Sequence, residues 1–358
     1  MTVLSRYFLK EIFSSVGICL FVFVSLYLVI HFFGRFDNFA EARVPLTRMV
    51  PYLLYKTPFI VVQMLPSAAL IGVIITFSGM KKRNEILSLR VSGMNIWEIS
   101  RPVLIASLLL AAGLFFLSEV IVPYTSSRSE QIYRKEVQKE GPGQFYDRGH
   151  IWYRGSNSIY WIKNFDRDKG VMVAPVFYFF DPSWRVAKRI QAQKGTWNHA
   201  VWNLEDGIIM KLKKAGDYGF SRFRNLNLGL AETPEDFVQE IKKPEEMNYW
   251  QLKRYIHDLE EEGYDATNYL IDMNIKLAFP MVTFIMILIG IPITLTIQKG
   301  GAPVAVSLGI LACFFYILCL GVSRSLGLSG VLPHLLSAWL ANGIFLFLGI
   351  YLMMTVDR

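Results

Sequence analysis

The chain contains little charge and little cysteine. Only 18% of its 358 residues are charged, whereas 53% are hydrophobic. Because soluble domains carry about 25% charged residues, this composition excludes an ordinary soluble globular protein, and the long apolar runs exclude a disordered chain. The three cysteines all lie within those runs, at Cys19, Cys313 and Cys319. Their positions exclude a disulfide framework and a CxxC-type metal site.

Signature motifs of common enzymes are also absent. The chain has no GxxxxGK[ST] phosphate loop and no HExxH zinc motif. Its five histidines are not spaced as metal ligands usually are; they are His31, His150, His199, His257 and His334. The sequence therefore gives no positive support for an enzyme. The net charge of +8 would suit a nucleic-acid binder, but in so apolar a chain it favours anionic lipid as the partner.

Six apolar runs are each long enough to cross a bilayer, which takes about 20 residues of helix. The predicted spans are residues 12–33, 57–80, 102–122, 277–298, 302–323 and 333–354. An even number of spans places both termini on the same side of the membrane. The first run is too long for a signal peptide and is followed by no small-residue cleavage site, so it is expected to remain in the protein.

Basic residues in the short loops predict the orientation. The side that holds the termini carries Arg6, Lys10, Lys81, Lys82, Arg83, Arg90, Arg101, Lys299 and Arg358. The other side carries Arg35, Arg43, Arg48, Lys56 and Arg324. We therefore expect both termini to be cytoplasmic and the long middle segment to lie outside.

The middle segment, residues 123–248, is polar and has the pattern of short strands. The expected strands are 151–154, 158–163, 171–180, 185–193 and 207–213, and turn clusters lie at 155–157, 166–170 and 181–182. Many short strands at this spacing predict a sandwich or jelly roll. Residues 249–262 then form an amphipathic helix with Leu252, Tyr255, Ile256 and Leu259 on one face. The expected domains are residues 1–122, 123–248 and 249–358.

The polar loop between the second and third spans is predicted to contain a short helix near residues 84–92. Asn84 suits an N-cap, Glu85 suits the first turn, and Gly93 suits the left-handed position after the end. One interpretation is a helix that lies on lipid headgroups; the other is a helix that docks into a groove of a cytoplasmic partner. Glu85 favours docking, because an acid gains nothing against an anionic leaflet.

Cations gather at the opposite ends of the spans: His31, Arg35, Arg43, Arg48, Lys56, Lys276 and Arg324. They either anchor helix ends at the interface or bind the phosphate of a lipid, since guanidinium groups match phosphate oxygens bidentately. Glu119 with Lys276 is expected to be a structural ion pair. Proline and glycine inside the spans (Pro58, Pro66, Pro280, Gly290, Pro292) either line a cavity or pack against neighbouring helices.

Three segments together are similar to one known family. They are 62–72 followed by 83–87 and 92–93, then 118–123, and then 276–280. In their order, and in the layout of three spans, a β domain and three spans, the chain resembles the LptF/LptG permeases of the lipopolysaccharide-export ABC transporter. Residues 4–8 and 26–32 are closer to LptG than to LptF.

The resemblance implies a bacterial inner-membrane permease subunit that takes lipopolysaccharide from the outer leaflet and passes it to a periplasmic bridge. It implies a sister LptF-type permease, an LptB-type ATPase dimer that binds the ATP, and LptC/LptA-type periplasmic partners, with no cofactor in this chain. The implied ATPase-coupling residues are Asn84, Glu85, Ile86, Leu89 and Arg90. The implied lipid-binding residues are His31, Arg35, Arg43, Lys56, Lys276 and Arg324. The alternative is a membrane-anchored periplasmic binding or scaffold protein that transports nothing.

Overall fold

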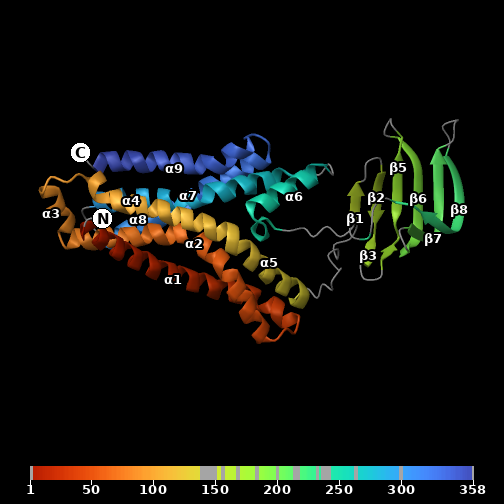
Figure 1. Cartoon of the computed structure of the whole chain (residues 1–358), viewed down its shortest axis with the longest axis horizontal. Coiled ribbons are helices and arrows are strands. Elements are labelled where there is room, and N and C mark those ends of the chain that lie inside the picture. The colour runs from red at the N-terminus through yellow and green to blue at the C-terminus, as the bar shows by residue number, and fades with distance from the viewer. Residues whose placement is uncertain are drawn as a thin grey trace. The chain divides into compact units, whose positions relative to one another are not determined.

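The computed structural model divides the chain into two units. It describes residues 3–137, 151–154, 158–166, 170–181, 185–198, 201–212, 218–230, 234, 243–261, 265–297 and 301–356. A helical unit contains residues 1–132, 243–258 and 265–358, and a β unit contains residues 133–242 and 259–264 (Figure 1). The predicted turn at 155–157, the inner part of the turn at 166–170 and the loop residues Lys299 and Gly300 lie outside the described residues.

Six helices of the described chain are long and apolar enough to span a membrane, so the prediction of six spans is confirmed. They are α1 (Val3–Glu41), α2 (Leu46–Lys82), α4 (Ile96–Phe116), α7 (Thr267–Thr296), α8 (Gly301–Leu328) and α9 (His334–Val356). Both α1 and α2 are far longer than the predicted runs, because amphipathic sequence continues the helix beyond the apolar stretch. With 39 residues α1 extends about 58 Å.

The third span does not end at Val122, where its apolar run ends. The helix continues through a π-helical segment η1 (Leu117–Ile121) into α5 (Val122–Ile132) and a second π segment η2 (Tyr133–Val137). Most residues of α5 are polar, but Ser126 and Ser129 are buried against neighbouring residues, so the polar extension is held by packing. The β unit therefore begins at Tyr133, beyond the predicted boundary at residue 123.

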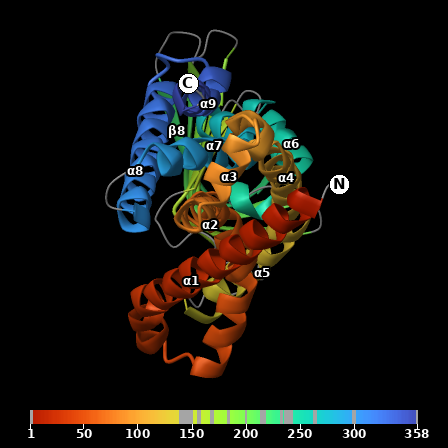
Figure 2. The ribbon, with the colours of Figure 1, turned by 90° about the vertical axis from the view of Figure 1, so that its left-hand side faces the viewer.

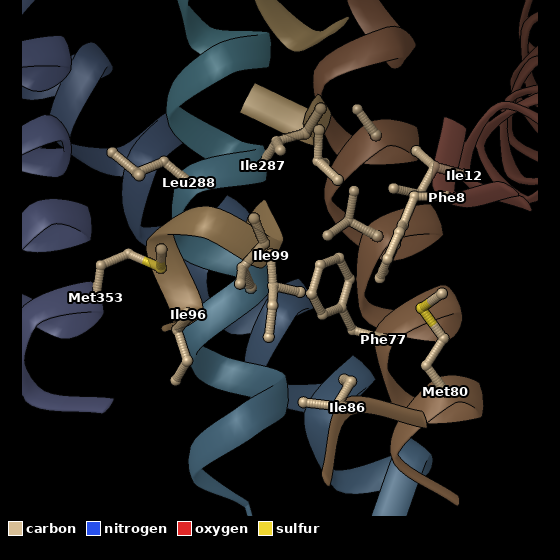
Figure 3. Packing of buried hydrophobic residues seen from close by; sticks show 14 of the residues in the cluster. Phe8, Ile12, Phe77, Met80, Ile86, Ile96, Ile99, Ile287, Leu288 and Met353 are labelled. Carbon is tan, nitrogen blue, oxygen red and sulfur yellow. The ribbon is translucent and has the colours of Figure 1, made fainter. Parts of the chain in front are cut away.

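Helices α2 and α7 form the centre of the helical unit, and α1 and α8 lie on its rim (Figure 2). One apolar cluster joins α1, α2, α3 (Glu85–Val91), α4, α7 and α9 (Figure 3). The α2–α7 contact is close at Gly290, where a Cβ atom would lie 2.8 Å from Leu70 Cδ1. Pro280 and Pro292 are buried in the same helix. These breaks in α7 therefore pack against neighbouring helices of the described chain.

The β unit contains one antiparallel sheet of eight strands among its described residues. They are β1 (Ile151–Arg154), β2 (Ser158–Ile162), β3 (Asn164–Asp166), β4 (Val171–Val173), β5 (Val176–Phe180), β6 (Val186–Asn198), β7 (Val201–Leu212) and β8 (Tyr218–Leu228). The order is β1-β2-β5-β6-β4-β3, and β7 pairs with the other edge of β6 and with β8. The prediction of an inserted jelly-roll-like β domain is confirmed.

Strand β6 makes the sheet curl into two layers. Its first half pairs with β5 and its second half, from Lys194, pairs with β4 along the same edge. Opposite this break, Asp206 of β7 has a left-handed backbone, with φ of 46°. The next residue, Gly207, has no room for a Cβ atom between the Gln191 carbonyl and the Phe223 ring. A bend through adjacent strands is how one sheet turns a corner into a sandwich.

Several strand predictions differ from the structure. The predicted strands 185–193 and 207–213 are the longer strands β6 and β7. The predicted strand 171–180 is two strands, because Ala174 takes a positive φ of 50° and Pro175 follows it. Strand β3 occupies part of a predicted turn, and β8 was not predicted at all. In β8 most side chains are exposed, so it lacks a clear apolar alternation. The return helix is present as α6 (Tyr249–Glu261), and Leu252, Ile256 and Leu259 are buried as predicted.

Candidate functional site

The short helix α3 follows α2 after a tight turn. Asn84 has a left-handed backbone with φ of 59° and makes no side-chain capping bond, so Asn84 is the N-cap residue as predicted, but its side chain does not cap the helix. The reversal itself needs the left-handed residue, and asparagine tolerates that conformation well. At the other end Gly93 has φ of 91°, which confirms the predicted helix end. With seven residues, α3 depends on its packing for stability.

Glu85 is held by the chain's own residues at the start of α3. The Arg83 guanidinium forms ion pairs with Glu85 and with Glu11 of α1, the second at 2.8 Å. The Tyr7 hydroxyl donates to the Glu85 carboxylate at 3.3 Å. Hydrogen bonds to Glu85 and Glu11 raise the pKa of Arg83, so this cation stays charged. The predicted coupling acid is thus positioned by α1 and by the turn before it.

The two faces of α3 differ in exposure. Ile86 is buried in the cluster that contains Phe77 and Ile287, and Leu89 packs at its edge (Figure 3). On the other face Leu87 is 59% exposed and Val91 is 80% exposed. These two residues are one turn apart, and we call them the α3 apolar face. Ile86 and Leu89, which were predicted as coupling residues, thus point inward, whereas the outward pair was not predicted.

One group of the predicted lipid-binding cations lies on α1 and α2. The His31 ring is stacked against Tyr27 and Tyr52, and its Nε2 lies 3.0 Å from the Tyr52 hydroxyl. His31 also lies within electrostatic range of Arg35 and Lys56. The Lys56 ammonium lies 4.5 Å from the centre of the Phe59 ring. The structure thus brings His31, Arg35 and Lys56 together, and we call them the α1–α2 cation group.

Lys276 is held by partners within the chain. Its ammonium contacts Glu119 Oε1 at 3.3 Å and also donates to the Met247 carbonyl. The second carboxylate oxygen of Glu119 accepts the Tyr249 backbone N–H at 2.6 Å. Both charged side chains are nearly buried, with 14% and 13% exposure. The expected Glu119–Lys276 ion pair is confirmed, and it ties the π segment of the third span to the start of α6.

Arg324 and Arg43 lie on other elements. Arg324 of α8 pairs with Asp272 of α7 at 2.8 Å, a partner that was not predicted from the sequence. Arg43 lies in the turn between α1 and α2, where it has a left-handed backbone. The predicted cations therefore consist of one aromatic-lined group, two internally paired residues, one residue in a turn, and Arg48 in the first turn of α2.

The β unit has an aromatic interior. Trp202 and Phe177 are fully buried, and Tyr160 is only 3% exposed. Phe179 and Trp197 pack at the edge of this cluster. Exposed aromatic residues of the sheet include Tyr218 and Phe220 on β8, which pairs with β7 alone among the described strands. Within the described residues no group of three or more histidine, cysteine or acidic side chains could hold a metal ion.

The fold defines the class of protein: a multi-pass membrane protein with an all-β unit inserted between its third and fourth spans. The chain belongs to the family described as lipopolysaccharide export system permease LptF/LptG, whose model matches residues 6–355. It is 22% identical over 358 residues to the lipopolysaccharide export system permease protein LptG of Escherichia coli strain K12, covering 98% of each chain. It is 20% identical to LptG of Haemophilus influenzae over 293 residues, which cover 80% of each chain.

The family and these relatives make this chain an LptG-like permease of a lipopolysaccharide export system. Its six apolar helices agree with a multi-pass protein of the inner membrane.

Proposed function

We propose that this chain is the LptG-type subunit of a transporter that extracts lipopolysaccharide from the outer leaflet of the inner membrane. Both termini would then be cytoplasmic, and the β unit would be periplasmic and would pass the lipid to a bridge of LptC/LptA-type partners. A sister LptF-type permease would complete the lipid path. ATP would be bound and hydrolysed by an LptB-type dimer, with no cofactor in this chain. The family membership and the six spans support this assignment.

The observation that carries the proposal is the divided surface of α3. Leu87 and Val91 of α3 are both largely exposed. Exposure of two apolar side chains to water is unfavourable. The inner face is anchored by Ile86, and the start of the helix is fixed by Arg83 and Glu85. An amphipathic helix whose outer apolar residues are one turn apart suits a groove in a partner protein. We assign that groove to the ATPase.

The α1–α2 cation group is the best candidate for the lipid phosphate. Its charges lie beside the Tyr27, Tyr52 and Phe59 rings, which offer apolar surface next to cationic groups. Lys276 and Arg324 form ion pairs with Glu119 and Asp272 within the chain. Because the cations of the α1–α2 cation group lie beside aromatic rings, we assign the phosphate to His31, Arg35 and Lys56, and give Lys276 and Arg324 a supporting role.

The test replaces the α3 apolar face by the double substitution Leu87→Gln and Val91→Gln. Two apolar side chains that become buried at an interface contribute about 1.5–3 kcal/mol each, so we expect the ATPase to be lost from the purified complex and lipid export to stop. The control is Val331→Gln, another largely exposed valine, between α8 and α9. Purification with the co-expressed ATPase and an assay of lipid release are the measurements.

The same experiment separates transport from the scaffold alternative. Full ATPase association and native export in the double variant would contradict the docking role of α3. If no ATPase purifies with the native chain, and lipid release does not respond to nucleotide, the protein is the scaffold instead.

A further inference from the structure

Lys81, in the last turn of α2, is bonded to the end of a different helix. Its ammonium donates to the Leu295 carbonyl at 2.9 Å and to the Ile297 carbonyl at 2.5 Å. A third, longer contact of 3.4 Å reaches the Thr294 carbonyl. These three carbonyls form the C-terminal end of α7, which ends at Thr296. One side chain thus joins α2 to α7 through the backbone.

Physical chemistry explains why a lysine is found at this position. The last carbonyls of a helix have no partners within the helix, and its C-terminus carries a partial negative charge. The last turn of α7 contains no basic residue of its own. A lysine ammonium offers three donors and a full positive charge, so Lys81 satisfies several of these carbonyls at once. The next residue, Lys82, is exposed.

Lys81 also lies at the base of α3. Glu85, the first residue of α3, is four positions further along the chain, after the tight turn at Asn84. Ile86 of α3 is buried in the same cluster as Ile287, Leu288 and Ile291 of α7 (Figure 3). Ile86 thus joins α3 to an apolar cluster that α7 shares, whereas Lys81 hydrogen-bonds directly to the α7 backbone.

The opposite half of α7 carries the two ion pairs described above. Asp272 pairs with Arg324 of α8, and Lys276 pairs with Glu119 of the π segment. About 35 Å of continuous helix separates Asp272 from Leu295, at 1.5 Å per residue. The Lys81 contact and both ion pairs therefore belong to one helix, which contains Pro280 and Pro292 between them. A shift of its Lys81 end would act on the element that bears both pairs.

We propose that Lys81 is a positioning residue that couples α3 to α7. This inference rests on the proposed function, because it names the path by which ATPase movement reaches the far ends of the spans. In this arrangement α7 transmits the motion, and without the Lys81 contact α3 would reach α7 only through the apolar cluster.

The test compares Lys81→Met, Lys81→Arg and Lys82→Met in the assembled transporter, reconstituted with lipopolysaccharide. The measurement is lipid released per ATP hydrolysed. We expect Lys81→Met to keep ATP hydrolysis but to lower this ratio about tenfold, a typical size for coupling between sites. Lys81→Arg should restore most of the ratio, because guanidinium also offers several donors. The ratio for Lys82→Met should equal that of the native protein.

A merely structural role would change assembly or thermal stability and leave the ratio unchanged. A native ratio in Lys81→Met would overturn the proposal, as would equal losses in Lys81→Met and Lys82→Met. If Lys81→Met does not assemble, Lys81→Gln keeps two N–H donors without the charge and allows the same comparison. Absence of ATP-dependent release from the native transporter would reject the proposed function as well, whereas a native ratio in Lys81→Met rejects only the coupling role.

Discussion

Helices α7 and α8 follow each other in the chain, but their environments in the folded unit are very different. Their most apolar stretches have almost the same mean hydropathy, 2.2 for α7 and 2.4 for α8. Yet 72% of that stretch is buried in α7 and only 17% in α8. The same contrast separates α2, with 67% buried, from α1, with 11%.

Hydropathy therefore identifies a membrane span but does not tell whether its side chains face protein or lipid. In a bilayer both environments are apolar, so a leucine is equally suitable in either. Close contacts occur in both helices: a Cβ atom on Gly290 of α7 would lie 2.8 Å from Leu70 Cδ1, and one on Gly309 of α8 would lie 2.5 Å from Ile74 Cδ1. In α8 these contacts cover only part of the helix surface, because a Cβ atom on Gly321 would meet nothing within 4 Å.

The largest expected difference between α7 and α8 concerns their ion pairs. Lys276→Met in α7 leaves Glu119 nearly buried without its cation, which typically costs about 3–5 kcal/mol. Arg324→Met in α8 breaks a pair whose side chains are 41% and 22% exposed, so the cost should be lower than for Lys276→Met. Thermal unfolding of the purified variants in detergent measures both.

The double variant Lys276→Met with Glu119→Gln serves as the control for this pair. It should recover most of the lost stability, because the stranded charge is then removed. Equal losses from Lys276→Met and Arg324→Met would show that burial in the helical unit does not determine the strength of these pairs.

A smaller effect is expected from glycines at helix contacts. A Cβ atom on Gly72 of α2 would lie 2.7 Å from Val16 Cγ2 and 2.8 Å from Val16 Cα, so Gly72→Ala must push α1 away. Overpacking of this kind costs about 1–3 kcal/mol. Gly321→Ala on the exposed side of α8 meets no neighbour and should raise stability by about 0.5–1 kcal/mol, because alanine is the better helix former. The shift in unfolding temperature of each variant tests this, and a neutral Gly72→Ala would contradict the close α1–α2 contact.

The sequence predicted the features that depend on local composition. The six spans follow from apolar length alone, and strand β1 has the predicted bounds Ile151–Arg154. The Glu119–Lys276 pair was predicted because both charges lie at ends of apolar runs. The strand β8 was missed, because its mostly exposed residues carry no clear apolar alternation.

The candidate site could be predicted only in part. Helical periodicity separates Ile86 and Leu89 from Leu87 and Val91, but all four are apolar, so the inward face cannot be chosen without the neighbouring helices. The Arg324–Asp272 pair and the Lys81 contact with Leu295 join residues far apart in the chain. No residue type in the sequence marks a backbone carbonyl at a helix end as the acceptor of a distant side chain. Such contacts require the tertiary structure.

The smallest expected effect concerns the buried side of α8. The Tyr316 hydroxyl donates to Asn342 Oδ1 of α9 at 2.7 Å, and Asn342 Nδ2 donates to the Ala278 carbonyl of α7 at the same distance. Hydrogen bonds between membrane helices contribute about 0.6 kcal/mol on average. Tyr316→Phe keeps the buried ring and should therefore lower stability by about that amount.

The matched control is Tyr351→Phe, which removes a hydroxyl from a tyrosine of α9 that is 66% exposed and should have no effect. Chemical unfolding in mixed micelles can resolve differences of this size when the variants are measured side by side. If both substitutions behave alike, the hydroxyl does not help to hold α8. If Tyr316→Phe instead costs several kcal/mol, this link would be as important to α8 as the Glu119–Lys276 pair is to α7. The contrast between α7 and α8 would then fail, because one polar contact would hold α8 as firmly as its ion pair holds α7.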